Sequence, residues 1–118
     1  LLTDENGRLL EGTATNFYAV REGVLYTAGD GVLEGITRKI LLNLLPEIGV
    51  PVVLQAITQQ EIGTLDEALL SSSSRAVFPV VSIAGQPVGD GHPGAIGRRL
   101  RIAYNEFVAR SIKTAVQP

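Results

Sequence analysis

The chain has 118 residues, of which 45% are hydrophobic and 19% charged, so it can bury the core of one domain and is not expected to be disordered. A formal net charge of −2 argues against a general nucleic-acid-binding protein, and the absence of cysteine excludes disulfides and thiolate metal sites. The start of the chain is polar and no apolar run reaches the roughly 20 residues of a membrane span, so we expect a cytoplasmic protein with no membrane partner.

The first third of the chain predicts short strands. Residues 8–11 follow a turn signal and are a candidate strand. The segments 16–21 and 24–27 flank the dipeptide Glu22-Gly23, a pattern typical of a β-hairpin. Residues 28–31 are rich in glycine and form a loop that leads to the next element.

A helix is predicted next, because apolar residues recur at helical spacing from Ile36 onward. Pro46 should end or kink this helix, and Gly49 should close it. Residues 50–56 then predict a strand.

The middle of the chain carries two apparent capping boxes, at 58–61 and 64–67, which predict two short helices. Residues 76–83 return to strand character, and the turn at 84–86 reverses the chain. A glycine-rich loop follows at 89–97.

The C-terminal segment, residues 96–114, predicts a helix. The basic cluster at 98–101 is interpreted as the solvated face of this helix rather than as a nucleic-acid site. The candidate core residues of the helix are Leu100, Ile102, Ala103, Phe107, Val108 and Ile112.

The start of the helix at Ile36 is a candidate phosphate site, because a helix N-terminus has unpaired N–H groups and a partial positive charge. Gly35 lets the backbone approach a ligand, Ile36 and Thr37 supply amides, and Thr37 adds a hydroxyl group. The alternative interpretation is an ordinary helix start with nothing bound.

The run Ser71–Ser74 followed by Arg75 is a second candidate of this kind. Small hydroxyl groups there can donate to phosphate oxygens, and Arg75 can hold a carboxylate with two hydrogen bonds. The alternative is a polar turn with a surface arginine.

Two further residues carry side chains suited to chemistry. Glu11 can pair with a protonated heterocycle nitrogen if it is half-buried, and otherwise it is a strand-end glutamate facing water. His92 is the only histidine of the sequence, so neither a metal site nor a Ser-His-Asp triad is expected.

Taken in their order and spacing, these segments resemble the C-terminal half of the class IV (fold type IV) aminotransferases, which use pyridoxal phosphate. The family includes branched-chain amino acid aminotransferase, D-amino acid aminotransferase and aminodeoxychorismate lyase. The resemblance implies an α+β fold, a sheet or partial barrel packed with helices. The motifs that carry it are residues 11–17, 23–27, 33–38, 73–80 and 83–91, followed by Pro93-Gly94.

The resemblance implies roles for two groups of residues toward pyridoxal 5'-phosphate. Glu11 matches the glutamate that pairs with the pyridine nitrogen, and Leu33 matches the leucine that packs against the ring. Ile36 and Thr37 match the residues whose amides bind the phosphate, with Gly35 in the same motif.

The remaining matched residues lie around the phosphate and the substrate. Arg38 completes the phosphate motif as a supporting residue rather than a direct ligand, and Ser73 matches a hydroxyl residue that reaches the same phosphate. Ser74 and Arg75 match the turn that faces the substrate carboxylate. Since branched-chain enzymes often have small residues there, Arg75 argues against a purely aliphatic substrate.

The resemblance also places the Schiff-base lysine and an N-terminal domain before the position of Glu11. Neither Lys39 nor Lys113 fits that motif, and the sequence has no methionine and begins at Leu1, so we expect residues 1–118 to be a single cofactor-binding domain of a longer enzyme. The expected substrates are an amino acid, of branched-chain type, and a 2-oxo acid, and the expected assembly is a homo-oligomer, at least a dimer. The isolated chain is expected to be inactive.

Two alternatives stay open at this point. The chain could be a fragment of an aminodeoxychorismate lyase, which would use the same cofactor contacts. It could instead be a truncated domain that folds and self-associates without catalysis.

Overall fold

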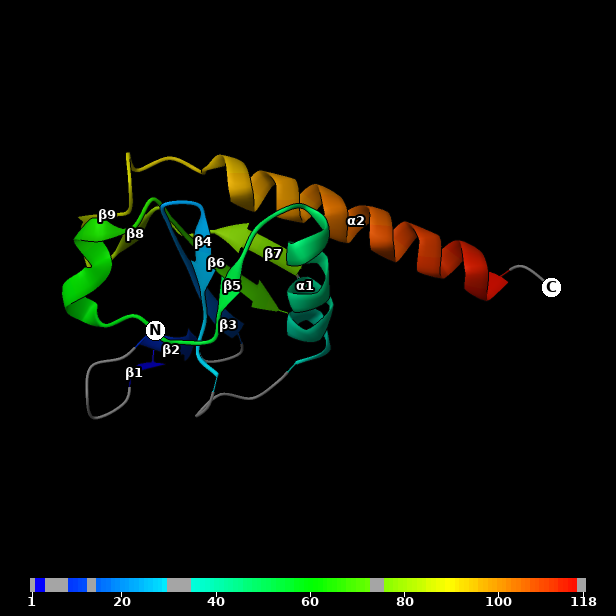
Figure 1. Cartoon of the computed structure of the whole chain (residues 1–118), viewed down its shortest axis with the longest axis horizontal. Helices are drawn as coiled ribbons and strands as arrows, with labels where there is room; N and C mark the ends of the chain where they lie inside the picture. The colour runs from blue at the N-terminus through cyan, green and yellow to red at the C-terminus, as the bar shows by residue number, and fades with distance from the viewer. Residues whose placement is uncertain (1, 4–8, 13–14, 30–34, 73–75, 117–118) are drawn as a thin grey trace.

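The computed structural model describes residues 2–3, 9–12, 15–29, 35–72 and 76–116. Within these ranges the chain forms short strands, two α-helices and one 3-10 helix, an α+β arrangement as expected (Figure 1). The elements are β1 Leu2–Thr3, β2 Leu9–Gly12, β3 Thr15–Arg21, β4 Val24–Tyr26, α1 Ile36–Glu47, β5 Val52–Val53, η1 Gln59–Thr64, β6 Glu67–Ser72, β7 Ala76–Pro79, β8 Ser82–Ile83, β9 Gln86–Pro87 and α2 Ala95–Val116.

Strand β3 is the centre of the larger sheet, because both of its edges are paired. One edge runs antiparallel to β6, from the pair Asn16↔Ser71 to the pair Val20↔Glu67. The other edge pairs with β2 near its start and with β4 near its end. β1 extends the sheet beyond β2, β5 joins β4 in parallel, and β7 joins β6.

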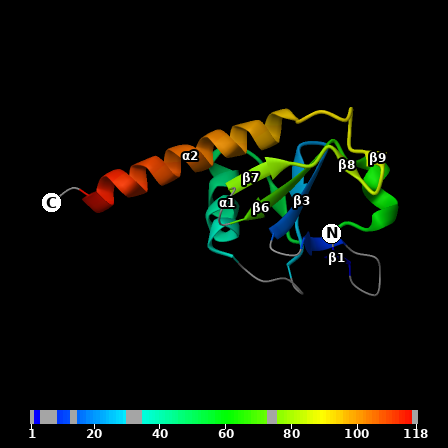
Figure 2. The ribbon, with the colours of Figure 1, turned by 180° about the vertical axis from the view of Figure 1, so that it is seen from behind.

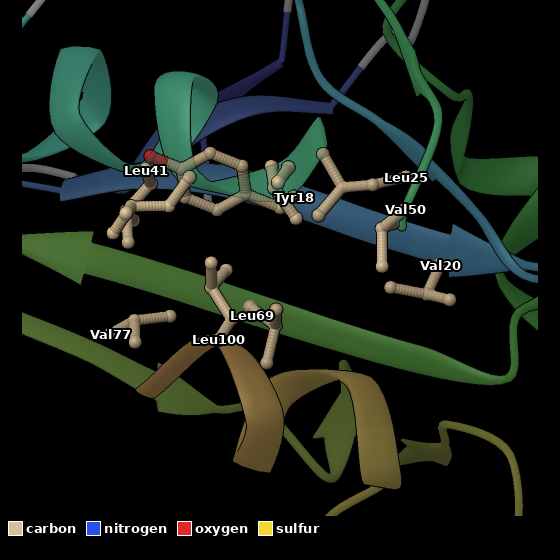
Figure 3. Packing of buried hydrophobic residues seen from close by; sticks show 10 residues of the cluster. Tyr18, Val20, Leu25, Leu41, Val50, Leu69, Val77 and Leu100 are labelled. Atoms are coloured by element: carbon tan, nitrogen blue, oxygen red, sulfur yellow. The ribbon is translucent and has the colours of Figure 1, made fainter. Parts of the chain in front are cut away.

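Alternate residues of β3 and β6 supply two separate cores, as expected for a sheet that is covered on both faces. Tyr18, Val20 and Leu69 belong to the cluster beneath α1 and α2. Figure 3 shows Tyr18 beside Leu41 of α1, and Leu100 of α2 close to Leu69. The opposite face carries the second cluster, which η1 and the β8–β9 hairpin cover: Phe17, Ala19, Ile57, Ile62, Leu65, Ala68, Ile83 and Val88.

The two clearest local predictions are confirmed. Glu22 and Gly23 both have positive φ, 53° and 78°, which matches the twist that a two-residue hairpin turn needs between β3 and β4. Helix α1 begins at Ile36 and ends at Glu47, one residue after Pro46. Gly49 has φ of +79°, so it reverses the chain directly after the helix.

The predicted strand at 50–56 is wrong in extent, since only Val52 and Val53 pair in β5. Leu54 is exposed and the chain leaves the sheet there. The predicted strand at 76–83 is divided into β7 and β8. β7 ends at Pro79, after which the amide of Val80 donates one more hydrogen bond to the carbonyl of Ala68 in β6, at 2.8 Å, before the chain enters the β8–β9 hairpin.

One of the two predicted capping boxes is confirmed and the other is wrong. Thr58 and Glu61 form a reciprocal capping box at the start of η1. Thr64 instead lies at the end of η1, where its hydroxyl donates to the carbonyl of Glu61 at 2.6 Å. Glu67 starts β6, so no second short helix forms here.

Helix α2 confirms the predicted helix at 96–114 but not all of its predicted core residues. Leu100 is fully buried, while Ile102 and Ile112 are 54% and 60% exposed. The C-terminal part of α2 runs past the sheet, which leaves this stretch without a partner surface in the described chain (Figure 2). Ala103 and Phe107 pack partly against the first cluster, and Val108 is half-buried.

Within the described part of the chain, neither helix is long and apolar enough to cross a membrane.

Glu67 fixes the start of α2 to the sheet. Its side chain is buried, and its two carboxylate oxygens accept hydrogen bonds from the amides of Ile96 and Gly97 at 3.0 and 2.9 Å. A Cβ atom on Gly94 would overlap with the Glu67 side chain, so the close approach depends on this glycine. A carboxylate from β6 therefore serves as the N-terminal cap of a helix far along the chain.

We predict that Glu67→Ala lowers the free energy of unfolding by about 1–2 kcal/mol, because two amides at the start of α2 lose their acceptor. Glu67→Gln should lie between the alanine variant and the wild type, since its amide keeps one acceptor oxygen. Urea unfolding measures both. Glu106→Gln, an exposed site on the same helix, is the control and should leave stability unchanged. An unchanged unfolding free energy for Glu67→Ala would contradict the capping role.

Candidate functional site

Among the described residues, no side chain caps the backbone donors at the start of α1. Gly35 is the N-cap residue in an extended conformation, φ −73° and ψ 158°, and it provides no side-chain hydrogen bond. The first turn contains no acidic residue, and the amide of Lys39 is the one that bonds back to the carbonyl of Gly35, at 3.1 Å. The preceding amides of the turn, including Ile36 and Thr37, therefore have no acceptor within the helix.

The side chains of the first turn point in different directions. Ile36 is 79% exposed, whereas Thr37 and Arg38 are buried. Ile36 thus offers its main chain to the site, while Arg38 turns into the protein. Arginine is almost never as buried as Arg38, which is 2% exposed, unless its guanidinium is hydrogen-bonded or ion-paired. The contacts of this guanidinium therefore indicate its role.

Arg38 connects α1 to the end of β4. Its guanidinium donates to the hydroxyl of Thr27 at 2.7 Å and to the carbonyl of Ala28 at 2.5 Å. Thr27 in turn donates to the carbonyl of Phe17 in β3 at 2.8 Å. The Nε atom of Arg38 has no hydrogen-bond partner among the described residues.

Tyr18 and Ser71 form a buried hydroxyl pair on the same face of the sheet, with 2.6 Å between their oxygens. Burial raises the pKa of Tyr18 above its ordinary value, and the bond to Ser71 and the nearby positive charge of Arg38 oppose this in part. The phenol therefore stays protonated and neutral at physiological pH.

The strand register places Ser71 in the same row of the sheet as Glu11, the candidate cofactor residue of β2. Glu11 pairs with Asn16, Asn16 with Ser71, and Ser71 with Val77, so one row crosses four strands. A Cβ atom on Gly35 would lie 3.6 Å from Oδ1 of Asn16, which places the start of α1 at the same row.

The structure thus brings together the backbone position of Glu11 and the whole motif Gly35, Ile36, Thr37 and Arg38. The predictions for Leu33, Ser73, Ser74 and Arg75 lie outside the described residues. Residues 73–75 connect the end of β6 to the start of β7, directly after Ser71 and Ser72.

Sequence reasoning missed Tyr18, Thr27 and Asn16 as parts of this site. The available signal was their position, since Asn16 and Tyr18 alternate along a strand and Thr27 follows a strand end. Their relation to α1 depends on pairing and packing that no local pattern indicates.

Other reactive side chains lie elsewhere. His92 is exposed and contacts Asp90, and Lys39 is exposed on α1. No group of three His, Cys, Asp or Glu side chains suited to a metal occurs among the residues that the structure describes.

The amino-transferase class IV family model matches residues 1–83. D-alanine aminotransferase from Staphylococcus haemolyticus is 35% identical over 100 residues, which are 83% of this chain and 36% of the relative. Branched-chain-amino-acid aminotransferase from Pseudomonas aeruginosa is 32% identical over 110 residues, 92% of this chain and 36% of the relative. This chain therefore spans just over a third of the length of these relatives.

Among solved structures, the branched-chain amino acid aminotransferase from Escherichia coli is similar with a TM-score of 0.81 and 32% sequence identity. The similarity covers 86% of this chain and 35% of that chain.

We predict that the phenol of Tyr18 ionises only above its ordinary pKa of 10.0 in the folded chain. The wild-type minus Tyr18→Phe difference in tyrosinate absorbance measures this directly.

Tyr18→Phe should also lower the free energy of unfolding by about 1 kcal/mol, because the buried Ser71 hydroxyl loses its partner. Because folding raises the pKa of Tyr18, the unfolded chain loses the phenol proton at a lower pH than the folded chain does. The stabilisation from this proton is therefore complete below pH 10 and is lost as the pH rises through the folded pKa. The stability gap between wild type and variant should therefore shrink in that range. Tyr104→Phe, on α2, is the control, and a gap that does not depend on pH would contradict the assignment.

Proposed function

This chain belongs to the class IV aminotransferase family, and we propose that it forms the part of such an enzyme that binds the phosphate and ring of pyridoxal 5'-phosphate. The observation that carries the proposal is the start of α1, where a glycine and a buried arginine flank amides that have no acceptor among the described residues. When bound, this cofactor stabilises negative charge at the α-carbon of an amino acid.

The residues at α1 fit a phosphate. The amides of Ile36 and Thr37 lie at the positive end of the helix dipole, and the first turn has no acidic residue to repel an anion. Gly35 has an ordinary extended conformation, and a Cβ atom there would make only ordinary contact. Since the fold itself does not require glycine at this position, we infer that the bare backbone leaves room for a ligand.

We propose that Glu11 pairs with the pyridine nitrogen of the cofactor and keeps it protonated. Its place in β2, opposite Asn16 in the row that reaches the start of α1, supports this. Leu33 is proposed to pack against the cofactor ring, as the family resemblance implies.

The proposed substrate contacts lie between β6 and β7. Ser73 is assigned to the cofactor phosphate, and Ser74 and Arg75 to a substrate carboxylate. These three residues follow Ser71 and Ser72 in the chain, and Ser71 lies in the same row as Asn16, which supports the assignments.

We propose that the complete enzyme transfers an amino group from a branched-chain-type amino acid to a 2-oxo acid, and that it works as a dimer or larger oligomer. The similarity to the Pseudomonas aeruginosa and Escherichia coli proteins supports the branched-chain substrate. The Staphylococcus haemolyticus relative makes D-alanine the second candidate. All three are aminotransferases, which favours amino transfer over the lyase reaction.

These 118 residues alone are proposed to lack transaminase activity. Lys39 is exposed on α1, and Lys113 belongs to the last turns of α2, so neither is proposed as the Schiff-base lysine.

The site predicts how Gly35→Asp will behave. Aspartate is a favourable N-cap in the extended conformation found here, so helix stability should be kept or raised. Its carboxylate should nevertheless repel phosphate and occupy the free amides, which weakens binding of pyridoxamine 5'-phosphate about tenfold or more. Titration calorimetry measures the affinity, and urea unfolding measures the stability.

Two controls make this test specific. Pyridoxamine without phosphate should bind equally to both proteins, and Gly35→Ala should weaken binding less than Gly35→Asp. Failure of the wild-type chain to bind pyridoxamine 5'-phosphate, or equal affinity in Gly35→Asp, would contradict the proposed site.

A further inference from the structure

Arg38 carries a buried positive charge whose described partners are neutral. The side chain is 2% exposed, and its two terminal nitrogens donate to the hydroxyl of Thr27 and the carbonyl of Ala28. Its Nε atom has no partner among the described residues. A buried charge is costly unless an opposite charge accompanies it. In the described part of the chain, no carboxylate forms an ion pair with Arg38.

The residue that carries this charge belongs to the first turn of α1, whose leading amides have no acceptor within the helix. Arg38 follows Ile36 and Thr37 in the first turn, and the helix N-terminus adds its own positive potential there. Among the described residues, Gly35 offers no side chain and the first turn has no acidic residue that would compensate either positive source. An anion at the start of α1 would supply the missing opposite charge.

We propose that Arg38 is a positioning residue whose buried charge holds the phosphate of a bound pyridoxal phosphate ligand in its dianionic form without contacting it. The inference rests on the proposed function, since it requires phosphate at the start of α1. Thr27 and Ala28 occupy two nitrogens of the guanidinium on the strand side of the helix, so Arg38 acts through its field and through the placement of the first turn.

The groups packed around Arg38 leave this charge in place. Tyr18 of β3 is titratable, but burial raises its pKa, and its hydroxyl is bonded to Ser71 of β6, so it stays neutral at physiological pH. Thr27, at the end of β4, contributes a neutral hydroxyl. Lys39, the next residue of α1, is exposed to solvent and adds a charge of the same sign.

The phosphorus NMR signal of pyridoxamine 5'-phosphate bound to the full chain tests this, followed as a function of pH. A phosphate monoester ordinarily takes its second negative charge near pH 6. In the wild type this pKa should fall by about one pH unit or more, because a buried cation favours the dianion.

Three variants isolate the charge. Arg38→Gln, which keeps hydrogen-bond donors but removes the charge, should return the phosphate pKa toward that of the free ligand. Arg38→Lys should keep the pKa lowered. Arg110→Gln removes the same charge from the exposed surface of α2 and should leave the pKa as in the wild type. A merely structural role would weaken binding in Arg38→Gln without changing the pKa of the ligand that still binds.

The outcomes separate this inference from the function it rests on. Bound ligand with an unshifted phosphate pKa in the wild type would overturn the role of Arg38 and leave the proposed function standing. No binding to the wild type would overturn both. If urea unfolding shows that Arg38→Gln does not fold, Arg38→Lys decides, because loss of the lowered pKa with a charge still present contradicts the proposal.

Discussion

The pairing register between β3 and β6 positions both the candidate site and the start of α2. At one end the pair Asn16↔Ser71 puts the Ser71 hydroxyl beside Tyr18, in the row whose Asn16 lies close to Gly35 at the start of α1. At the other end the pair Val20↔Glu67 presents the Glu67 carboxylate to the start of α2. A shift of one residue would turn both side chains to the opposite face. The same ladder therefore holds the candidate site and docks the long helix.

Features that depend on a few neighbouring residues could be predicted from the sequence. The hairpin at Glu22-Gly23, the start of α1 after Gly35 and the burial of Leu100 each follow from local turn chemistry or helical spacing. The α1 motif is also one continuous segment, so its position at a helix start could be predicted locally. The roles assigned to Glu11, Leu33, residues 35–38 and residues 73–75 toward a cofactor or substrate remain predictions.

Features that depend on distant partners could not be predicted in this way. Thr58–Glu61 and Thr64–Glu67 look alike as capping boxes, but only the first is satisfied locally. Glu67 caps a helix that follows it by about thirty residues in the chain, as its bonds to Ile96 and Gly97 show. The sequence likewise places Arg38 in the α1 motif, but only its contact with Thr27 after β4 reveals that its charge is buried.

The glycines separate what the fold requires from what a ligand requires. Gly89 has φ of +57°, and a Cβ atom there would overlap with the backbone carbonyl of Asp66, so the approach of the chain to β6 demands glycine. Gly94 is demanded by the side chain of Glu67 in the same way. Gly35 meets no such demand, since its conformation suits any residue and its surroundings would accept a methyl group. The described residues therefore do not require glycine at the start of α1. The proposed phosphate would give the missing side chain a role, because it needs close access to the amides of Ile36 and Thr37.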